Sequence, residues 1–180
     1  MSENIKKWLE NGEQSNITKD VTEIVSEFKG NDFEKIISIL NWMNKNLKRC
    51  TDQDKVLKIF ATRNVSEVLK DMLSTGCHDD ALIFTTFCRA VGIPAKYVVG
   101  ISKLNPKNSG HCVVELYLPA GGWILVDQSR GSVYIDPQRS DFYRMNFIVG
   151  KGLDSWDVGI SSFKTWEEKA DRIIELISKI

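Results

Sequence analysis

The feature that most constrains the fold is a long apolar segment between two glycines, followed by a change in hydrophobic periodicity. Between Gly76 and Gly92 the chain has neither glycine nor proline, and Gly92 and Pro94 provide a stop signal, so this segment predicts one helix. After Pro94, helical spacing gives way to alternation and to residues that favour strands. Helices are therefore expected before this point and strands after it.

Cys77 lies in the first turn of this predicted helix. Unpaired N–H groups and the positive end of the helix dipole favour a thiolate at such a position. At about 100° per residue, Cys77 shares one stripe with Phe84 and Cys88 and continues the face that packs inward. The alternative is a buried cysteine without chemistry, because cysteine is among the most buried residue types. Which of the two interpretations holds for Cys77 depends on whether the chain supplies partner residues for its thiol.

The segment before the cysteine helix predicts a series of shorter helices. Apolar residues recur at helical spacing over about residues 5–11, 18–28, 31–47, 51–62 and 65–73. Asn31 with Glu34, and Asn64 with Glu67, form capping-box patterns at two of the helix starts. Gly76 should end the last of these helices, which would leave the cysteine in a tight helix-to-helix turn.

The segment after Pro94 predicts strands and one closing helix. Strands are expected over residues 95–102, 111–118 and 122–127, with shorter ones near 132–135 and 145–149. Residues 103–110 are expected to form an exposed loop, 119–122 a hairpin turn and 150–157 an ordered loop beside the cleft. An amphipathic helix should begin at Thr165, with its apolar side formed by Trp166, Ala170, Ile173, Ile177 and Ile180.

Composition supports one domain and excludes several classes of partner. A chain of 180 residues, 42% of them hydrophobic, can form one core over residues 1–180, with a helical part (1–63), a central part that contains Cys77 (64–131) and closing strands and helix (132–180). Lys plus Arg and Asp plus Glu are balanced at 24 each, so we expect neither a nucleic acid nor a membrane as partner. Without a signal core or a spanning segment, a cytoplasmic protein is expected. The four scattered cysteines predict reduced thiols.

A histidine and an aspartate at the ends of neighbouring predicted strands give Cys77 possible partners. His111 opens one strand and Asp127 ends the next, which is otherwise apolar. A regular hairpin centred on residue 119 would place the two side chains nearly opposite, within about 5 Å. A thiol at a helix start, an imidazole on a facing strand and a carboxylate that orients it are the nucleophile, base and orienting residue of acyl-transfer catalysis. The candidate catalytic residues are therefore Cys77, His111 and Asp127.

Other arrangements of these residue types are less favourable. Cys77 and Cys88 are three helical turns apart, about 16 Å, and cannot share a zinc ion. Strand alternation turns Cys112 away from His111. We therefore expect no metal site. His78 differs in direction from Cys77 by about 100°, so we interpret it as a residue at the rim or substrate side of the site rather than the base.

Three further roles follow from position. Asp79 and Asp80 are interpreted as first-turn acids favoured by the helix dipole. Glu115 is the reserve orienting residue if the hairpin register differs from the expected one. The backbone N–H of Cys77 would form half of an oxyanion hole. Upstream candidates for its second donor are Trp42, Gln53 and Asn64.

Three ordered motifs resemble the transglutaminase-like branch of the papain-like cysteine enzymes. The three motifs lie within residues 64–131. They are the cysteine motif Gly76–Ala81 with the end of its helix and the following strand (Cys88–Gly100), the histidine motif His111–Pro119 and the aspartate motif Gly122–Asp127. The resemblance implies Cys77 as nucleophile, His111 as general base and Asp127 as its orienting residue, in an α+β fold that packs the cysteine helix on an antiparallel sheet. The chain departs from the usual family pattern by having no residue between the glycine and the cysteine, Val113 in place of a tryptophan and Gln128 in place of a proline.

The resemblance also implies a reaction class. We expect a thiol-dependent acyl-transfer enzyme, a cysteine protease or amidohydrolase, that acts on a protein or peptide substrate through a cysteine thioester and needs no metal or organic cofactor. One alternative is a protein-glutamine γ-glutamyltransferase that cross-links or deamidates. The others are an inactive peptide-binding module of the same fold, and arylamine acyl transfer from a thioester donor.

Overall fold

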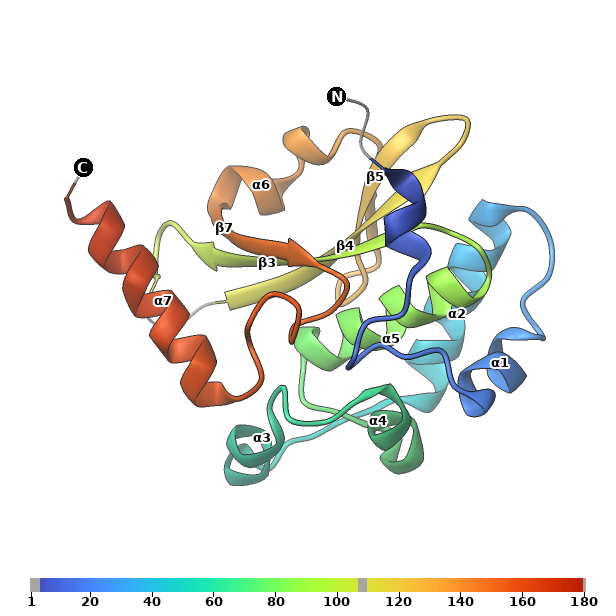
Figure 1. Ribbon diagram of the computed structural model, residues 1–180, viewed down its shortest axis with the longest axis horizontal. Coiled ribbons are helices and arrows are strands. Elements are labelled where there is room, and N and C mark those ends of the chain that lie inside the picture. The colour runs from blue at the N-terminus through green and yellow to red at the C-terminus, as the bar shows by residue number, and fades with distance from the viewer. Residues whose placement is uncertain (1–3, 107–109, 180) are drawn as a thin grey trace.

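The fold was examined in a computed structural model, which describes residues 4–106 and 110–179. Helices precede most of the strands along the chain (Figure 1). In chain order the elements are η1 (Ile5–Leu9), α1 (Lys19–Val25), α2 (Asp32–Asn46), β1 (Lys48–Arg49), α3 (Gln53–Ile59), α4 (Val65–Asp71), β2 (Leu73–Ser74), α5 (Cys77–Ala90), β3 (Ala95–Ser102), β4 (Gly110–Leu118), β5 (Gly122–Asp127), β6 (Ser132–Tyr134), η2 (Pro137–Arg139), α6 (Asp141–Met145), β7 (Asn146–Gly152) and α7 (Phe163–Ile177).

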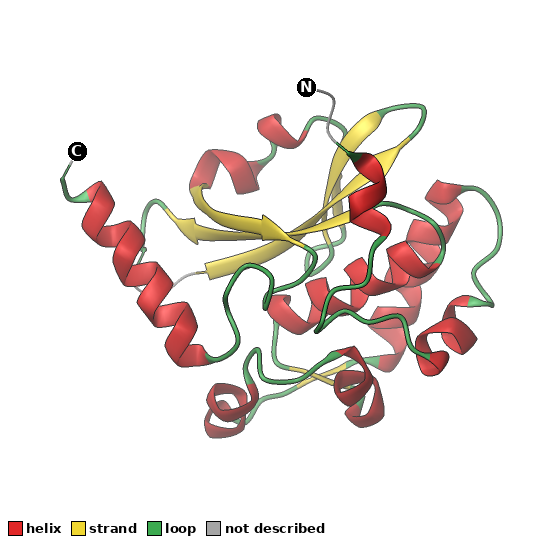
Figure 2. Ribbon diagram, in the orientation of Figure 1, coloured by secondary structure: helices red, strands yellow, loops and turns green. Residues whose placement is uncertain are grey.

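Five strands form one antiparallel sheet in the order β6-β5-β4-β3-β7. Helix α5 lies along one face of this sheet together with α1, α2 and α4, whereas α6 lies on the other face (Figure 2). Helix α7 packs at the end of the sheet where β3 ends and β4 begins (Figure 1). The arrangement confirms the predicted α+β fold with the cysteine helix on an antiparallel sheet.

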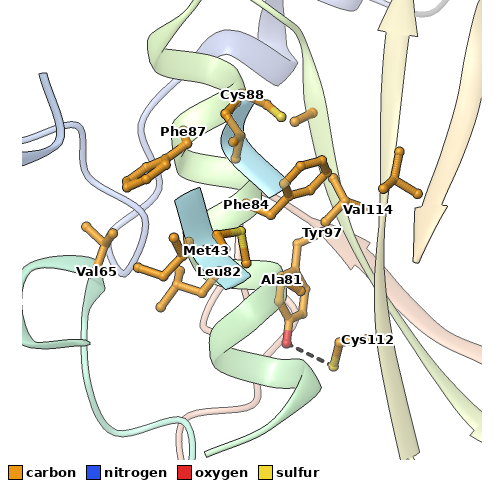
Figure 3. Packing of buried hydrophobic residues seen from close by; sticks show 14 of the residues in the cluster. Met43, Val65, Ala81, Leu82, Phe84, Phe87, Cys88, Tyr97, Cys112 and Val114 are labelled. Carbon is orange, nitrogen blue, oxygen red and sulfur yellow. Dashed lines mark hydrogen bonds between the residues drawn. The ribbon is translucent and has the colours of Figure 1, made fainter. Parts of the chain in front are cut away.

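The main core lies between α5 and the sheet (Figure 3). In α5 every residue from His78 to Arg89 is buried, and only its two terminal residues are partly exposed. Alternate residues of β3 and β4, such as Tyr97 and Cys112, face α5. Their neighbours Val98 and Val113 form a smaller cluster on the opposite face. Strand alternation therefore separates the cysteine side of the sheet from the α6 side.

The local signals for helix starts are confirmed, but one predicted helix end is wrong. Complete capping boxes begin α2 at Asn31 and α4 at Asn64. Helix α4 ends at Asp71, and Met72 takes a left-handed conformation (φ 48°), so Gly76 does not terminate it. The next two residues form β2, which pairs in parallel with β1. Cys77 thus follows a short strand rather than a helix-to-helix turn, because strand pairing satisfies backbone groups that the expected turn would leave unpaired.

The two ends of the described chain differ modestly from expectation. The predicted helix over residues 5–11 is a short 3-10 helix, η1, whose Trp8 is buried. Helix α7 begins at Phe163, two residues before the predicted start, because Ser162 caps it. Ile180 and residues 107–109 of the predicted loop lie outside the described residues. Within 4–106 and 110–179, none of the helices combines the length and apolar character needed to cross a membrane.

Candidate active site

Cys77 is held at the start of α5 by the conformation of the residue before it. Gly76 has φ 141°, which L side chains rarely adopt. A Cβ atom there would also lie 3.3 Å from Arg49 Nη1. The glycine lets the chain turn from β2 directly into α5 and offers no side chain to cap the helix. The first-turn N–H groups and the helix dipole therefore favour negative charge at Cys77.

His111 and Asp127 meet, although not directly across the hairpin. His111 Nε2 lies 2.8 Å from Asp127 Oδ2, and the Arg130 N–H donates to Asp127 Oδ1 at 3.2 Å. The ladder pairs Glu115 with Leu125, so the hairpin is centred on residue 120 rather than 119. This moves the register by two residues, and a shift of two keeps each side chain on its face. The predicted proximity is confirmed, with a diagonal geometry in place of a direct one.

The bond to Asp127 determines which nitrogen of His111 is available. Because Nε2 is engaged by the carboxylate, Nδ1 is left for the Cys77 thiol, with which the ring also hydrogen-bonds. Burial of the ring lowers the pKa of His111. The hydrogen bonds to Asp127 and Cys77 outweigh burial and raise that pKa to about 9. The imidazole is therefore protonated at neutral pH.

The thiol of Cys77 is correspondingly acidic. Its hydrogen bond with the Cys112 side chain lowers the pKa of Cys77 most, burial opposes this, and the hydrogen bond and positive charge of His111 lower it further. The net effect places the pKa of Cys77 well below its usual range. A lowered pKa of the Cys77 thiol beside a raised pKa of the His111 imidazole favours a thiolate next to an imidazolium, the reactive form of a cysteine.

A mainly apolar cavity of about 80 Å³ opens beside the thiol. Its lining comes from α5, β3, β4, the start of α7 and the segments before α4 and α7: Phe60, Cys77, His78, Tyr97, Val99, Gly110, His111, Cys112, Ile160, Phe163 and Trp166. Gly110 is required here, since a Cβ atom would lie 2.4 Å from the Trp166 ring. The indole therefore packs directly on the backbone next to His111 and closes one side of the site.

Residues 19–128, more than half of the chain, match the model of the transglutaminase-like superfamily. The chain belongs to the transglutaminase-like superfamily. An uncharacterised protein of Haemophilus influenzae is 28% identical over 141 residues, covering 63% of this chain and 36% of its own length. A crystal structure from Cytophaga hutchinsonii, described as a candidate cysteine protease, has a TM-score of 0.65 at 20% identity over 87% of this chain and 50% of that one. The chain thus spans at most half of either protein.

The other candidates from the sequence lie elsewhere in this transglutaminase-like fold. Glu115 bonds Lys151 at 2.9 Å and the Tyr143 hydroxyl on the α6 side of the sheet. Asp127, and not Glu115, is therefore the carboxylate that hydrogen-bonds His111. Cys88 is buried deep in the core. Cys112 faces α5, as alternation predicts. Residues 150–157 do not line the cavity, which is bordered instead by Ile160.

His78 is not a rim residue. It is 2% exposed, and its Nδ1 lies 2.7 Å from the Tyr97 hydroxyl. Its ring lines the cavity beside Cys77, but the expected exposure at the rim is wrong. The sequence could not show this because the partner, Tyr97, lies on a strand nineteen residues away.

Asp79 and Asp80 are buried anchors as well as first-turn acids. Asp79 Oδ2 accepts from Arg63 at 2.6 Å and from the backbone N–H of Thr75 at 2.8 Å. Asp80 accepts from Ser74 at 2.6 Å and from Arg49 at 2.8 Å. Together they fix the segment before Cys77 to the first turn of α5. Dipole reasoning from the sequence found the position of these acids but missed their partners.

Gln128 was noted in the sequence only as a departure from the family pattern. Its Nε2 donates to the Cys77 carbonyl at 3.2 Å and to the Cys112 carbonyl at 2.9 Å. One amide thus joins α5 to β4 at the two cysteines. The available signal was a polar residue directly after an apolar strand that ends in Asp127.

Proposed function

We propose that this chain is a thiol-dependent acyl-transfer domain that hydrolyses peptide or amide bonds through a cysteine thioester. The observation that carries the proposal is the meeting of three groups: Cys77 at the start of α5, His111 beside its thiol, and Asp127 2.8 Å from the far ring nitrogen of His111. These are the nucleophile, base and orienting group that acyl transfer requires. Membership of the transglutaminase-like superfamily supports the same reaction class.

The first half-reaction follows from the protonation states. The Cys77 thiolate attacks the carbonyl carbon, and the carbonyl electron pair moves to oxygen. As the tetrahedral intermediate collapses, the C–N bond breaks, and the imidazolium of His111 gives its proton to the departing amine. The products are a free amine and a thioester on Cys77. Asp127 keeps the ring oriented and stabilises its charged form.

The second half-reaction reverses the proton transfer. Neutral His111 takes a proton from water, the hydroxide attacks the thioester carbonyl, and the C–S bond breaks. The thiolate of Cys77 and the imidazolium of His111 are then restored. If a primary amine takes the place of water, the same steps form a new amide bond.

The developing oxyanion is placed beside the start of α5. The backbone N–H of Cys77 is suited to donate to it, with the helix dipole adding stabilisation. The three upstream residues expected to supply a second donor lie elsewhere. Trp42 packs on Phe87, the Asn64 side chain caps α4, and Gln53 is exposed at the start of α3.

Cleavage of a proteome-derived peptide library tests the proposal without knowledge of the natural substrate. We expect wild-type protein to generate new peptide termini and Cys77→Ala to generate none, because the thioester cannot form. Cys88→Ala is the matched control, since it removes another thiol of the same helix outside the cavity. Mass spectrometry of the products provides the measurement, and the acyl adduct on Cys77 can be sought in the same samples.

Adding a fluorescent primary amine to the same incubation separates hydrolysis from transfer. New termini without amine incorporation support the hydrolase. Incorporation at glutamine side chains with no new termini would instead identify an amine transferase. If wild type and Cys88→Ala produce nothing beyond Cys77→Ala in either readout, the proposed catalytic function is wrong.

A further inference from the structure

Cys112 lies next to the candidate nucleophile and has no role in the mechanism above. Both cysteines line the same cavity. Gln128 Nε2 bonds both of their carbonyl oxygens, which holds the two backbones close together. On the other side of Cys112, the Tyr97 hydroxyl lies 3.0 Å from its sulfur (Figure 3). The Cys112 thiol is therefore fixed between Tyr97 and Cys77.

A series of hydrogen bonds runs from Gln14 through His78 and Tyr97 to Cys112. The donor and acceptor in each bond can be assigned by starting from Gln14. Gln14 is fully buried, and its Oε1 accepts from Ser155 Oγ at 2.8 Å and from the Ser155 N–H at 3.3 Å. Its Nε2 donates to the Arg63 carbonyl at 2.9 Å. These bonds fix the orientation of the amide, so Nε2 faces His78 Nε2 at 3.4 Å. Because an amide nitrogen only donates, His78 Nε2 is the acceptor.

The tautomer of His78 then determines the next two bonds. Burial is the largest effect on His78 and lowers its pKa, so the ring is neutral and carries its proton on Nδ1. That N–H donates to the Tyr97 oxygen at 2.7 Å. Burial raises the pKa of Tyr97, so its hydroxyl keeps a proton and donates it to Cys112 Sγ at 3.0 Å. The S–H of Cys112 is consequently not used by Tyr97 and is available to the neighbouring sulfur of Cys77.

We propose that Cys112 is a positioning residue that donates its S–H hydrogen bond to the Cys77 thiolate, and that Tyr97 and His78 orient this donor. The inference rests on the proposed function for its catalytic meaning, but not for its chemistry. A thiol is a weak donor to neutral groups, yet a charged acceptor strengthens the bond. The thiolate therefore has two stabilising side chains, Cys112 and His111, of which His111 supplies the charge.

Other groups around the thiolate remain in place when Cys112 is changed. Titratable groups that face or influence Cys77 come from three elements: His78 and Asp80 on α5, Tyr97 on β3, and His111 and Cys112 on β4. The backbone of Cys112 also hydrogen-bonds the Cys77 sulfur. Side-chain variants of Cys112 keep that backbone contact, so they isolate the S–H donor.

The test is the pH dependence of iodoacetamide alkylation at Cys77, resolved by mass spectrometry in the full chain. Cys112→Ala should raise the alkylation pKa of Cys77 by about one unit, the shift expected when a hydrogen bond to a charged group is lost. Cys112→Ser keeps a hydrogen-bond donor, so in this variant the alkylation pKa of Cys77 should stay close to the wild-type value. Tyr97→Phe removes the hydroxyl that orients Cys112 and should give a smaller rise. Cys88→Ala should give none.

The outcomes separate this inference from the proposed function. If His111→Ala raises the alkylation pKa but folded Cys112→Ala leaves it unchanged, the positioning role of Cys112 is wrong while the ion pair survives. If neither variant moves it, the ion pair fails as well, and the catalytic proposal fails with it. If Cys112→Ala does not fold, Tyr97→Phe decides, and an unchanged alkylation pKa in that variant overturns the inference.

Discussion

The two cysteines of α5 lie on one stripe of the same helix and have opposite acid–base properties. Cys88 is fully buried, and burial raises the pKa of its thiol far above the usual range despite the charge of Arg89. Cys77 is partly exposed, and its hydrogen bonds with Cys112 and His111 place its pKa well below that range. The surroundings of a thiol, rather than its residue type or helical face, therefore determine its chemistry.

The two ends of the helix differ in the same way. Near Cys88, apart from the buried Arg89, the helix packs through apolar side chains such as Phe84 and Phe87, which are fully buried in the core (Figure 3). Around Cys77 the first turn carries Asp79 and Asp80, whose ion pairs and hydrogen bonds tie it to other segments. Apolar packing holds the helix against the sheet, and the polar contacts hold its first turn, where reactivity is needed.

Removing His111 should bring Cys77 closer to an ordinary thiol and is the largest expected effect on activity. His111→Ala takes away the base and the charge beside the thiolate, so kcat/KM for library-derived peptides should fall about 10³-fold. The alkylation pKa of Cys77 should rise toward the free-thiol value of about 8.5. Steady-state kinetics and site-resolved alkylation measure the two effects. Activity within tenfold of wild type, with Cys77 still reactive at low pH, would contradict the assigned role of His111.

Lowering the pKa of His111, instead of removing the residue, should shift the pH range in which Cys77 is a thiolate and Cys88 is not. The thiolate–imidazolium pair forms above the lowered pKa of Cys77 and is lost as pH rises through the His111 pKa of about 9. Asp127→Asn removes a charge that raises the pKa of His111. The alkaline limb of the kcat/KM profile should then move to lower pH, with a loss of about 10²-fold at neutral pH.

The exposed carboxylate of Asp141, at the start of α6, offers a matched control for Asp127. Asp141→Asn changes the same functional group but should leave the profile unchanged. Equal shifts in Asp141→Asn and Asp127→Asn would show that general surface charge, rather than the bond to His111, governs the alkaline limb.

Features that depend on short stretches of sequence could be predicted. The bounds of β3 and β5 match the expected ranges, and the capping boxes at Asn31 and Asn64 are present, because alternation and cap chemistry act over a few residues. The meeting of His111 and Asp127 also follows from one hairpin. A register error of two residues did not matter there, since it preserves the face of each side chain.

Features that depend on distant partners could not be predicted. The β1–β2 pair joins segments 25 residues apart, and the buried bond from Arg63 to Asp79 has no local signature. Tyr97 was expected only as a strand residue, although a hydroxyl in an apolar strand needs a partner. The hydrogen bonds from Gln14 through Tyr97 to Cys112 could be identified only from the tertiary structure. The catalytic roles of Cys77, His111 and Asp127 remain predictions for the experiments above.

Replacing Cys88, the other cysteine of α5, is expected to have the smallest effect of these changes. Cys88→Ala deletes one buried sulfur from a packed core, so we expect the free energy of unfolding in urea to fall by about 1 kcal/mol. The alkylation profile of Cys77 and the activity should stay at wild-type values, because Cys88 lies outside the cavity and has no contact with the ion pair among the described residues. A change in the pKa of Cys77 would instead mean that core packing transmits strain along α5 to the thiolate.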